Sequence, residues 1–125
     1  MIFGVGIDII EIERVAEKIS KENGFREKIF SKHEIEFCES KGLNKAQHYA
    51  ARFSAKEAFL KATGMGLLLS VELNEIEVLV TNEGKPEIQL SGSIAGLTHQ
   101  KGWRINVSLS HIQSNACSIV IIETV

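Results

Sequence analysis

The pattern of residues 45–63 predicts one long helix, and this helix most limits what the chain can fold into. Apolar side chains recur along it at the three- and four-residue spacing of one helix face, and Gly64 follows as a left-handed stop. The members of this face are Ala46, Tyr49, Ala50, Phe53 and Leu60. A helix with such a face must bury it against other elements.

One carboxylate, Glu57, falls on this apolar face between Phe53 and Leu60. An ionised carboxylate that is partly buried without a partner tends to take up a proton, so a metal ion or a basic side chain is expected beside it. The alternative interpretation is an ordinary helical ion pair with Lys61, which would add only about 0.2 to 0.5 kcal/mol. The helix alone does not decide between the two.

The first residues alternate as a β-strand, predicted over residues 1–8, with Gly4, Gly6 and Asp8 on one of its faces. Two glycines weaken a strand, so something is expected to approach that backbone closely, and Asp8 stands at its far end. Asp8 is alternatively a cap of the next helix, although that helix is predicted to begin only near Glu11. The opposite face of the strand carries Phe3, Val5, Ile7 and Ile9.

A third segment, residues 105–111, alternates apolar residues with Asn106, Ser108 and Ser110 and ends at His111. Hydroxyl and imidazole N–H groups donate to phosphate oxygens, so this pattern suits an anion site. Taken alone, a solvent-facing side of an antiparallel strand is the commoner explanation.

The remaining patterns place helices early in the chain and strands late. Ser31 and Glu34 have the spacing of a capping box. Helices are predicted over residues 11–21, 25–30, 31–42 and 93–100, and strands over 76–80, 88–90, 104–110 and 116–123. This order predicts the α+β class, with helices packed on an antiparallel sheet. No linker, repeat or low-complexity tract appears, so we expect one domain over residues 1–125.

Composition bears on the partners and the compartment. A formal net charge of −2 argues against a nucleic-acid binder. Cys38 and Cys117 lack metal-site or redox spacing, so both are expected to be reduced. The first residues have no basic segment and their apolar run is interrupted, so we expect neither a signal peptide nor a membrane span, and a cytoplasmic location is the default.

Three motifs carry a resemblance to a known family: Gly-Ile-Asp-Ile at 6–9, Phe-Ser-Ala-Lys-Glu-Ala-Phe-Leu-Lys-Ala-Thr-Gly at 53–64, and Ser-Leu-Ser-His at 108–111. Together they resemble the holo-acyl-carrier-protein synthases of the 4′-phosphopantetheinyl transferase superfamily, over nearly the whole chain. The resemblance implies transfer of 4′-phosphopantetheine from coenzyme A to a serine of apo acyl carrier protein, with release of adenosine 3′,5′-bisphosphate, in fatty acid biosynthesis. It also implies a homotrimer with sites between neighbouring subunits.

The resemblance also implies roles for single residues. Asp8 and Glu57 match the family's magnesium ligands, and Mg²⁺ prefers hard carboxylate oxygens. Lys61 is placed at the pyrophosphate and His111 near the nucleotide end of coenzyme A. The group that takes the serine proton stays open between Glu57 and a metal-bound water. Gly64 allows the backbone to approach a ligand closely.

Basic residues on the long helix extend the predicted coenzyme A site. Lys45, Arg52 and Lys56 share one row of this helix, which suits a ligand with several phosphates. A solvated face would explain that row equally well.

The first helix offers a candidate docking strip for the acidic carrier protein. It consists of Arg14, Lys18 and Lys21, with Arg26 nearby. The alternative is an ordinary charged face balanced by glutamates. We expect this strip to lie beyond the wall formed by Asp8 and Glu57, so that a single chain lacks the surface for both substrates.

Two rival functions are a broad-range phosphopantetheinyl transferase and a non-catalytic coenzyme-A-binding module. Broad-range members generally join two such units in one chain, which this short chain does not. A binding module would leave Asp8 and Glu57 without a purpose, since carboxylates repel phosphates. A transferase narrow in its choice of carrier is therefore the preferred hypothesis.

Overall fold

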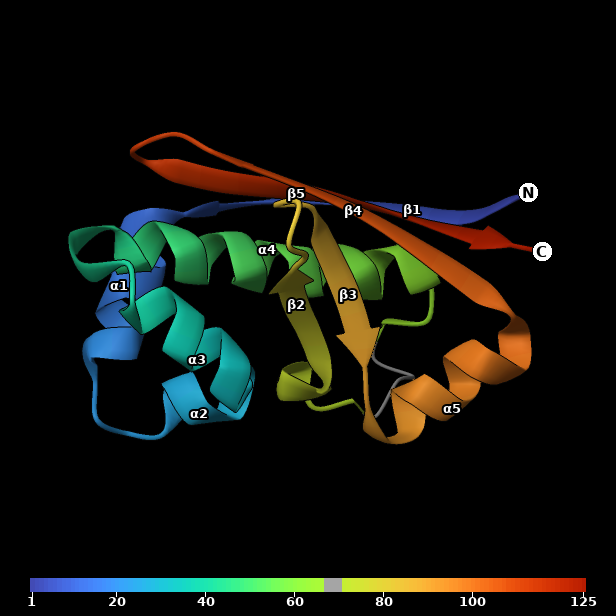
Figure 1. Cartoon of the computed structure of the whole chain (residues 1–125), viewed down its shortest axis with the longest axis horizontal. Helices are drawn as coiled ribbons and strands as arrows, with labels where there is room; N and C mark the ends of the chain where they lie inside the picture. The colour runs from blue at the N-terminus through green and yellow to red at the C-terminus, as the bar shows by residue number, and fades with distance from the viewer. Residues whose placement is uncertain (67–70) are drawn as a thin grey trace.

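The computed structural model describes residues 1–66 and 71–125 of the chain (Figure 1). The helices are α1 (Ile12–Ser20), α2 (Phe25–Ile29), α3 (Lys32–Glu39), α4 (Lys45–Thr63) and α5 (Gly92–Lys101), with short 3-10 turns η1 (Gly42–Asn44) and η3 (Leu73–Glu75). The strands are β1 (Ile2–Glu11), β2 (Ile76–Val80), β3 (Pro86–Leu90), β4 (Trp103–His111) and β5 (Asn115–Thr124). None of these helices combines the length and the apolar character needed to cross a membrane.

The strands form two antiparallel sheets, where the sequence patterns predicted one. The larger has the order β1-β5-β4, and β2 and β3 form a separate hairpin. The hairpin crosses α4 instead of joining the larger sheet, and β2 contacts the helix (Figure 1). In the larger sheet the antiparallel pairing of β1 with β5 brings the chain ends side by side, where the Met1 amino group donates to the Thr124 carbonyl at 3.1 Å.

Helix α4 lies between the larger sheet and the other elements, so more than one of its sides is buried (Figure 1). Of the predicted apolar face, Tyr49 and Ala50 are fully buried, whereas Ala46, Phe53 and Leu60 are only partly buried. The other buried apolar side chains of α4 are Ala51, Ala55, Ala58, Phe59 and Ala62. The single-face prediction was therefore incomplete, because a helix held between two layers has no fully solvated side.

The two glycines of β1 allow this strand to touch α4. A Cβ atom added to Gly4 would lie 1.9 Å from the carbonyl oxygen of Ala62, and one added to Gly6 would lie 1.9 Å from that of Ala58. Backbone atoms cannot swing aside as a side chain does, so a larger residue would push the strand off the helix. The close neighbour that the glycines predicted is helix α4 itself, and the contact brings the following Asp8 against this helix.

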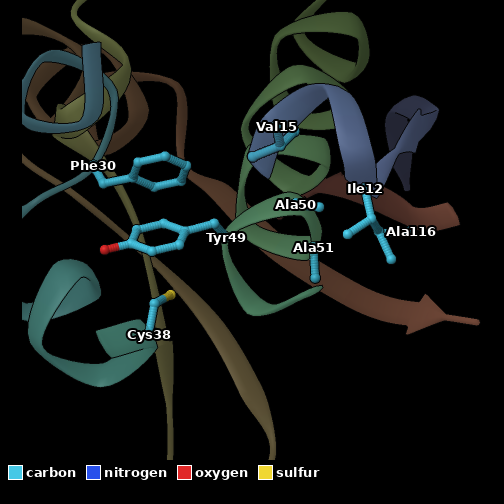
Figure 2. Close-up of a cluster of buried hydrophobic side chains, with 8 residues drawn as sticks. All are labelled: Ile12, Val15, Phe30, Cys38, Tyr49, Ala50, Ala51 and Ala116. Atoms are coloured by element: carbon cyan, nitrogen blue, oxygen red, sulfur yellow. The ribbon is translucent and has the colours of Figure 1, made fainter. Parts of the chain in front are cut away.

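A hydrophobic cluster joins α1, α2, α3 and α4 at one end of the molecule (Figure 2). Its buried members are Ile12, Val15, Phe30, Cys38, Tyr49, Ala50, Ala51 and Ala116. The rings of Phe30 and Tyr49 meet edge to face with centroids 4.8 Å apart, and the Tyr49 hydroxyl donates to Glu39 at 2.7 Å. Because Val15 is buried in this cluster, it fixes the position of α1 and of the adjacent Arg14.

Two local predictions about helix ends are confirmed. Ser31 caps α3: its hydroxyl accepts from the Glu34 amide at 3.2 Å, and its own amide donates to Glu34 Oε1 at 2.9 Å. Gly64 ends α4 in the left-handed conformation with φ of 69°.

Candidate functional site

Asp8 and Glu57 come from different elements and line the same cleft. Asp8 belongs to β1, where it pairs with Ser118 of β5, and Glu57 belongs to α4. Their cleft has a volume of about 260 Å³. Because β1 continues to Glu11, Asp8 stands inside the strand, so its interpretations as the strand end and as a helix cap were both wrong.

The surroundings of Glu57 favour a cation. Burial raises the pKa of this carboxyl above its usual value, the charge of Asp8 raises it further, and Lys61 partly offsets both. Burial and a neighbouring carboxylate each disfavour the ionised form until a cation compensates them. Carboxyl groups perturbed in this way gather at functional sites, so the pair is a candidate cation site.

Lys61 contacts Asp8 and not Glu57. Its Nζ donates to Asp8 Oδ1 at 3.2 Å and to the Ile7 carbonyl at 3.1 Å, while 57% of the side chain stays exposed. Over residues 1–66 and 71–125 no ion pair joins Glu57 to Lys61, so the interpretation as an ordinary helical pair was wrong. The ammonium prefers Asp8 because the backbone of β1 adds a second acceptor there.

A second cleft, of about 650 Å³, opens beside the first. Its lining residues are Glu57, Leu60, Lys61, Gly64, Gly66, Val71 and Leu73. Glu57 therefore lines both clefts, with Asp8 in the first and Lys61 in the second. This position at the junction lets one carboxylate face two ligands at once.

Part of the predicted docking strip lies in the first cleft. Arg14 and Lys18 line it together with Asp8 and Glu57, so the expectation that the strip lies beyond these acids was wrong for this pair. The reason is that α1 follows β1 directly and is packed against α4 through Val15. The cleft also contains two phenylalanine rings, Phe25 and Phe53.

The rest of the strip lies outside this cleft. Lys21 is exposed just after α1. Arg26 makes ion pairs with Glu27 at 2.8 Å and with Glu39 at 3.4 Å. The structure therefore brings Arg14 and Lys18 to the acidic pair but leaves Lys21 and Arg26 on the neighbouring surface.

The basic row predicted on the long helix does not form one surface. Lys56 is fully buried and paired with Glu34 at 2.7 Å, so neither a phosphate contact nor a solvated face describes it. Lys45 is exposed and pairs with Glu39 at 3.3 Å. Arg52 is only 3% exposed. The helical spacing was correct, but the second layer of the fold covers part of the row.

Arg52 and His111 are instead close to a histidine that the sequence patterns did not indicate. Arg52 donates to the His48 carbonyl at 3.3 Å, and its guanidinium lies 4.2 Å from the ring centroid of Phe37. The rings of His48 and His111 are 6.1 Å apart. Burial, together with the nearby charges of Arg52, Lys41 and His111, lowers the pKa of His48. Its place one helical turn before Arg52 was the available signal.

The acidic pair fits magnesium better than zinc. Within the part of the chain that the structure describes, no group of three or more Asp, Glu, His or Cys side chains forms a metal cage. Protein-bound Mg²⁺ commonly uses one or two carboxylates, with waters and substrate phosphates completing its shell. Zinc sites usually have three or four protein ligands. Two carboxylates in an open cleft therefore suit the magnesium pattern.

A family model and curated relatives match this chain over nearly its whole length. A family model described as the 4′-phosphopantetheinyl transferase superfamily matches residues 4–120. The holo-[acyl-carrier-protein] synthase of Cytophaga hutchinsonii is 46% identical over 125 residues, covering 97% of each chain.

Solved structures with the same fold include two complexes. The ACPS-CoA complex of Chronobacterium ammoniagenes has a TM-score of 0.85 at 29% identity, covering 98% of this chain and 97% of that one. The holo-(acyl-carrier-protein) synthase of Bacillus anthracis, in complex with CoA (3′,5′-ADP), has a TM-score of 0.83 at 32% identity, covering 100% and 99%. These likenesses confirm the predicted fold class of helices packed on antiparallel strands.

Proposed function

We propose that this chain, which belongs to the 4′-phosphopantetheinyl transferase superfamily, is a holo-[acyl-carrier-protein] synthase that uses coenzyme A to modify apo acyl carrier protein. The observation that carries the proposal is the position of Glu57 at the junction of two clefts. One cleft presents Asp8 with basic residues of α1, and the other presents Lys61. A reaction between a protein and a nucleotide needs such a meeting point.

In the proposed reaction the serine oxygen of the carrier attacks the phosphorus that bears the pantetheine arm. A P–O bond forms to serine, the bridging P–O bond of the pyrophosphate breaks, and adenosine 3′,5′-bisphosphate leaves with the electron pair. Asp8 and Glu57 would hold Mg²⁺, which when bound would offset negative charge on the pyrophosphate. We assign the serine proton to Glu57, because its carboxylate lies where the two clefts meet.

Lys61 would bind the pyrophosphate. More than half of the Lys61 side chain is exposed, and ion pairs with an exposed partner contribute only about 0 to 1 kcal/mol, so a phosphate can replace Asp8 as its partner. The carbonyl of Ile7 keeps the ammonium near Asp8 before substrate arrives. The Lys61 ammonium is thus kept near the site by a backbone acceptor, while its carboxylate partner can be exchanged for a phosphate.

The carrier protein would dock on the α1 side of the first cleft. Arg14 and Lys18 lie there beside the acidic pair, and Lys21 extends the positive surface; Arg26 would join it by exchanging its glutamate partners for the carrier. An acidic partner helix is complementary to these side chains, and such complementarity mainly speeds association. The partly buried rings of Phe25 and Phe53, which line the cleft, would then meet apolar groups of the carrier.

The outer face of the larger sheet supports self-association into a homotrimer. Phe3, Val5, Ile7 and Ile9 of β1 are each 47% exposed or more, and Ile119 of β5 is 37% exposed. In the described ranges no helix covers this face, since α4 packs on the other one (Figure 1). Apolar patches of this kind mark interaction sites. A second copy of this chain is the occupant we propose.

A trimer would also give His111 a role. His111 with His48, Arg52 and Lys45 forms a basic group that lines neither cleft of its own chain. In the assembly that we propose, a neighbouring subunit contributes this group to the nucleotide end of coenzyme A. Imidazole N–H groups and the exposed Lys45 ammonium suit phosphate oxygens, and the buried Arg52 would hold His48 in place.

We further propose that residues 1–125 form one domain and that the enzyme acts in the cytoplasm, in fatty acid biosynthesis. The family match from residue 4 to residue 120 supports the single domain. Both cysteines are free, and burial raises the pKa of Cys38 to about 12, so this thiol is not poised to react. Two free thiols, one of them buried and unreactive, suit a reducing compartment.

A mass measurement tests the function directly. The protein is incubated with coenzyme A, Mg²⁺ and apo acyl carrier protein, and the intact carrier is weighed by mass spectrometry. A gain of one phosphopantetheine group, with matching release of adenosine 3′,5′-bisphosphate, is expected. Glu57→Gln enzyme and a carrier with its acceptor serine changed to alanine are the controls. Binding of coenzyme A without any gain in carrier mass would leave only the binding module.

A further inference from the structure

Lys56 adjoins Glu57 in the sequence but is buried on another side of α4, away from both clefts. An ammonium has three N–H donors, and each finds an acceptor here. Lys56 Nζ donates to Glu34 Oε1 at 2.7 Å, to the Leu73 carbonyl at 3.0 Å and to the Ile76 carbonyl at 2.5 Å. Two of its three hydrogen bonds therefore go to backbone carbonyls, one at the start of η3 and one at the start of β2.

Glu34 completes the same network from the start of α3. Its Oε1 also accepts from the Ser31 amide, and its Oε2 accepts from the Val78 amide at 2.9 Å. Both side chains of the pair are fully buried. The network thus links α3, α4, η3 and β2 through two side chains that make three hydrogen bonds each.

Leu73 connects this network to the second cleft. On one side of that cleft stand Glu57, Leu60 and Lys61 of α4, and on the other stand Val71 and Leu73. Lys56 is part of the same helix and holds the carbonyl of Leu73. One residue therefore fixes how far the Leu73 wall lies from the helix that carries Glu57.

Stability alone is a weak reason for such a pair. Well-packed apolar residues often serve as well as a buried ion pair, because removing two charges from water is unfavourable. An ammonium does provide direction, since each of its donors sets the place of one acceptor. The buried pair is therefore better explained by the positions that Lys56 gives to its acceptors than by stability.

We infer that Lys56 is a positioning residue, which sets the width of the coenzyme A cleft through the carbonyl of Leu73. The inference rests on the proposed function, because it assigns the second cleft to coenzyme A. Lys56 itself touches no substrate. Loss of its ammonium should therefore weaken use of coenzyme A more than it slows the chemical step.

Steady-state kinetics on Lys56→Met and on a matched control, Glu34→Gln, test this. Both variants break the same ion pair and should lower the free energy of unfolding. Only Lys56→Met frees the Leu73 carbonyl, so it should raise the KM for coenzyme A about tenfold or more while kcat changes less than about threefold. Glu34→Gln should keep this KM within about twofold of wild type. An equal rise of KM in both variants would overturn the inference, since stability alone would then explain it.

A double-mutant cycle with Leu73→Ala gives a second, independent reading. If Lys56 acts through Leu73, the double variant should have a KM no higher than the worse single variant. The inference would be overturned if the increase of KM in the double variant equalled the product of the increases in the two single variants. If Lys56→Met does not fold, Lys56→Gln enters the same cycle.

The two levels of the proposal fail differently. Wild-type protein that transfers nothing to the carrier contradicts the proposed function. Wild-type protein that is active, with multiplying effects in the cycle, contradicts only the role of Lys56.

Discussion

Two lysine–carboxylate pairs on α4 have the same chemistry and opposite surroundings. The Lys56–Glu34 pair is 2.7 Å long and both side chains are 0% exposed. The Lys61–Asp8 pair is 3.2 Å long, with side chains 57% and 15% exposed. The comparison teaches that burial, more than the identity of the partners, decides whether a pair is fixed or can exchange.

The physical reason is the access of water. A buried ammonium that loses its carboxylate must stay unpaired or give up its proton, and both are unfavourable, so its pair stays closed. An exposed ammonium can turn to water or to an incoming phosphate with little change in free energy. The first pair suits structure that must not move, and the second suits a residue that changes partner during a reaction.

The largest expected effect comes from breaking the buried pair. Glu34→Ala leaves Lys56 unpaired and removes the α3 capping box, and should lower the free energy of unfolding by about 3 to 5 kcal/mol. Urea denaturation of the metal-free protein measures it. Asp8→Ala, which breaks the exposed pair, is the matched control and should change stability by less than about 1 kcal/mol. Similar losses in the two variants would mean that burial does not separate the pairs.

Removing the exposed lysine should have the opposite result, a large loss of activity with little loss of stability. Lys61→Met should lower kcat/KM for coenzyme A by roughly a hundredfold or more, because an electrostatic contact to the reacting phosphates is lost. The same variant should unfold within about 1 kcal/mol of wild type. Steady-state kinetics and urea denaturation, carried out on one preparation of the variant, measure the loss of activity and the free energy of unfolding. Strong destabilisation with little kinetic change would assign Lys61 to structure.

Salt should distinguish the exposed cleft from the buried network. Arg14→Glu should lower kcat/KM for the carrier about tenfold at low salt, and the difference should shrink as salt rises, since exposed charges are screened. Affinity for coenzyme A, measured by calorimetry on the isolated enzyme, should stay unchanged. Lys85→Glu, on the turn between β2 and β3, is the control for net charge. A salt-independent defect would argue against electrostatic docking.

The smallest effect concerns the pH dependence of the metal-free protein. The pKa of Glu57 is raised in the fold, so the native state binds more protons than the unfolded state between the ordinary and the raised value. Stability therefore falls as pH rises through that interval. Glu57→Gln should be more stable than wild type at neutral pH, by less than about 1 kcal/mol because the site is partly exposed. The gain should vanish below the ordinary pKa of glutamate, and thermal unfolding at several pH values would show whether it does.

Local features were predictable from the sequence because the residues that determine them are close together in the chain. The Ser31–Glu34 cap and the Gly64 stop follow from spacings of a few residues. The glycines in β1 predicted a close backbone contact, which α4 makes. The three motifs predicted that Asp8 and Glu57 belong to one site, and both residues line the same cleft.

The fate of Lys56 was not predictable in this way. Helical spacing tells which side chains share a face, but it does not tell how many layers will cover the helix. Lys56 is buried because β2 packs on α4, because the carbonyls of Leu73 and Ile76 accept from its ammonium, and because Glu34, already used as a cap, also pairs with it. His48 escaped notice for a similar reason, since its neighbour His111 comes from the far end of the chain.

The meeting of the two chain ends has a consequence for gene duplication. Met1 and Thr124 are hydrogen-bonded to each other, and neither lines the clefts that hold Asp8 and Glu57. In a fusion of two copies head to tail, the second copy would therefore begin beside the point where the first copy begins, away from the residues that line both clefts. A fused dimer is thus accessible to this fold in one genetic step, and one copy would then be free to lose its own chemistry while still presenting a surface to the other.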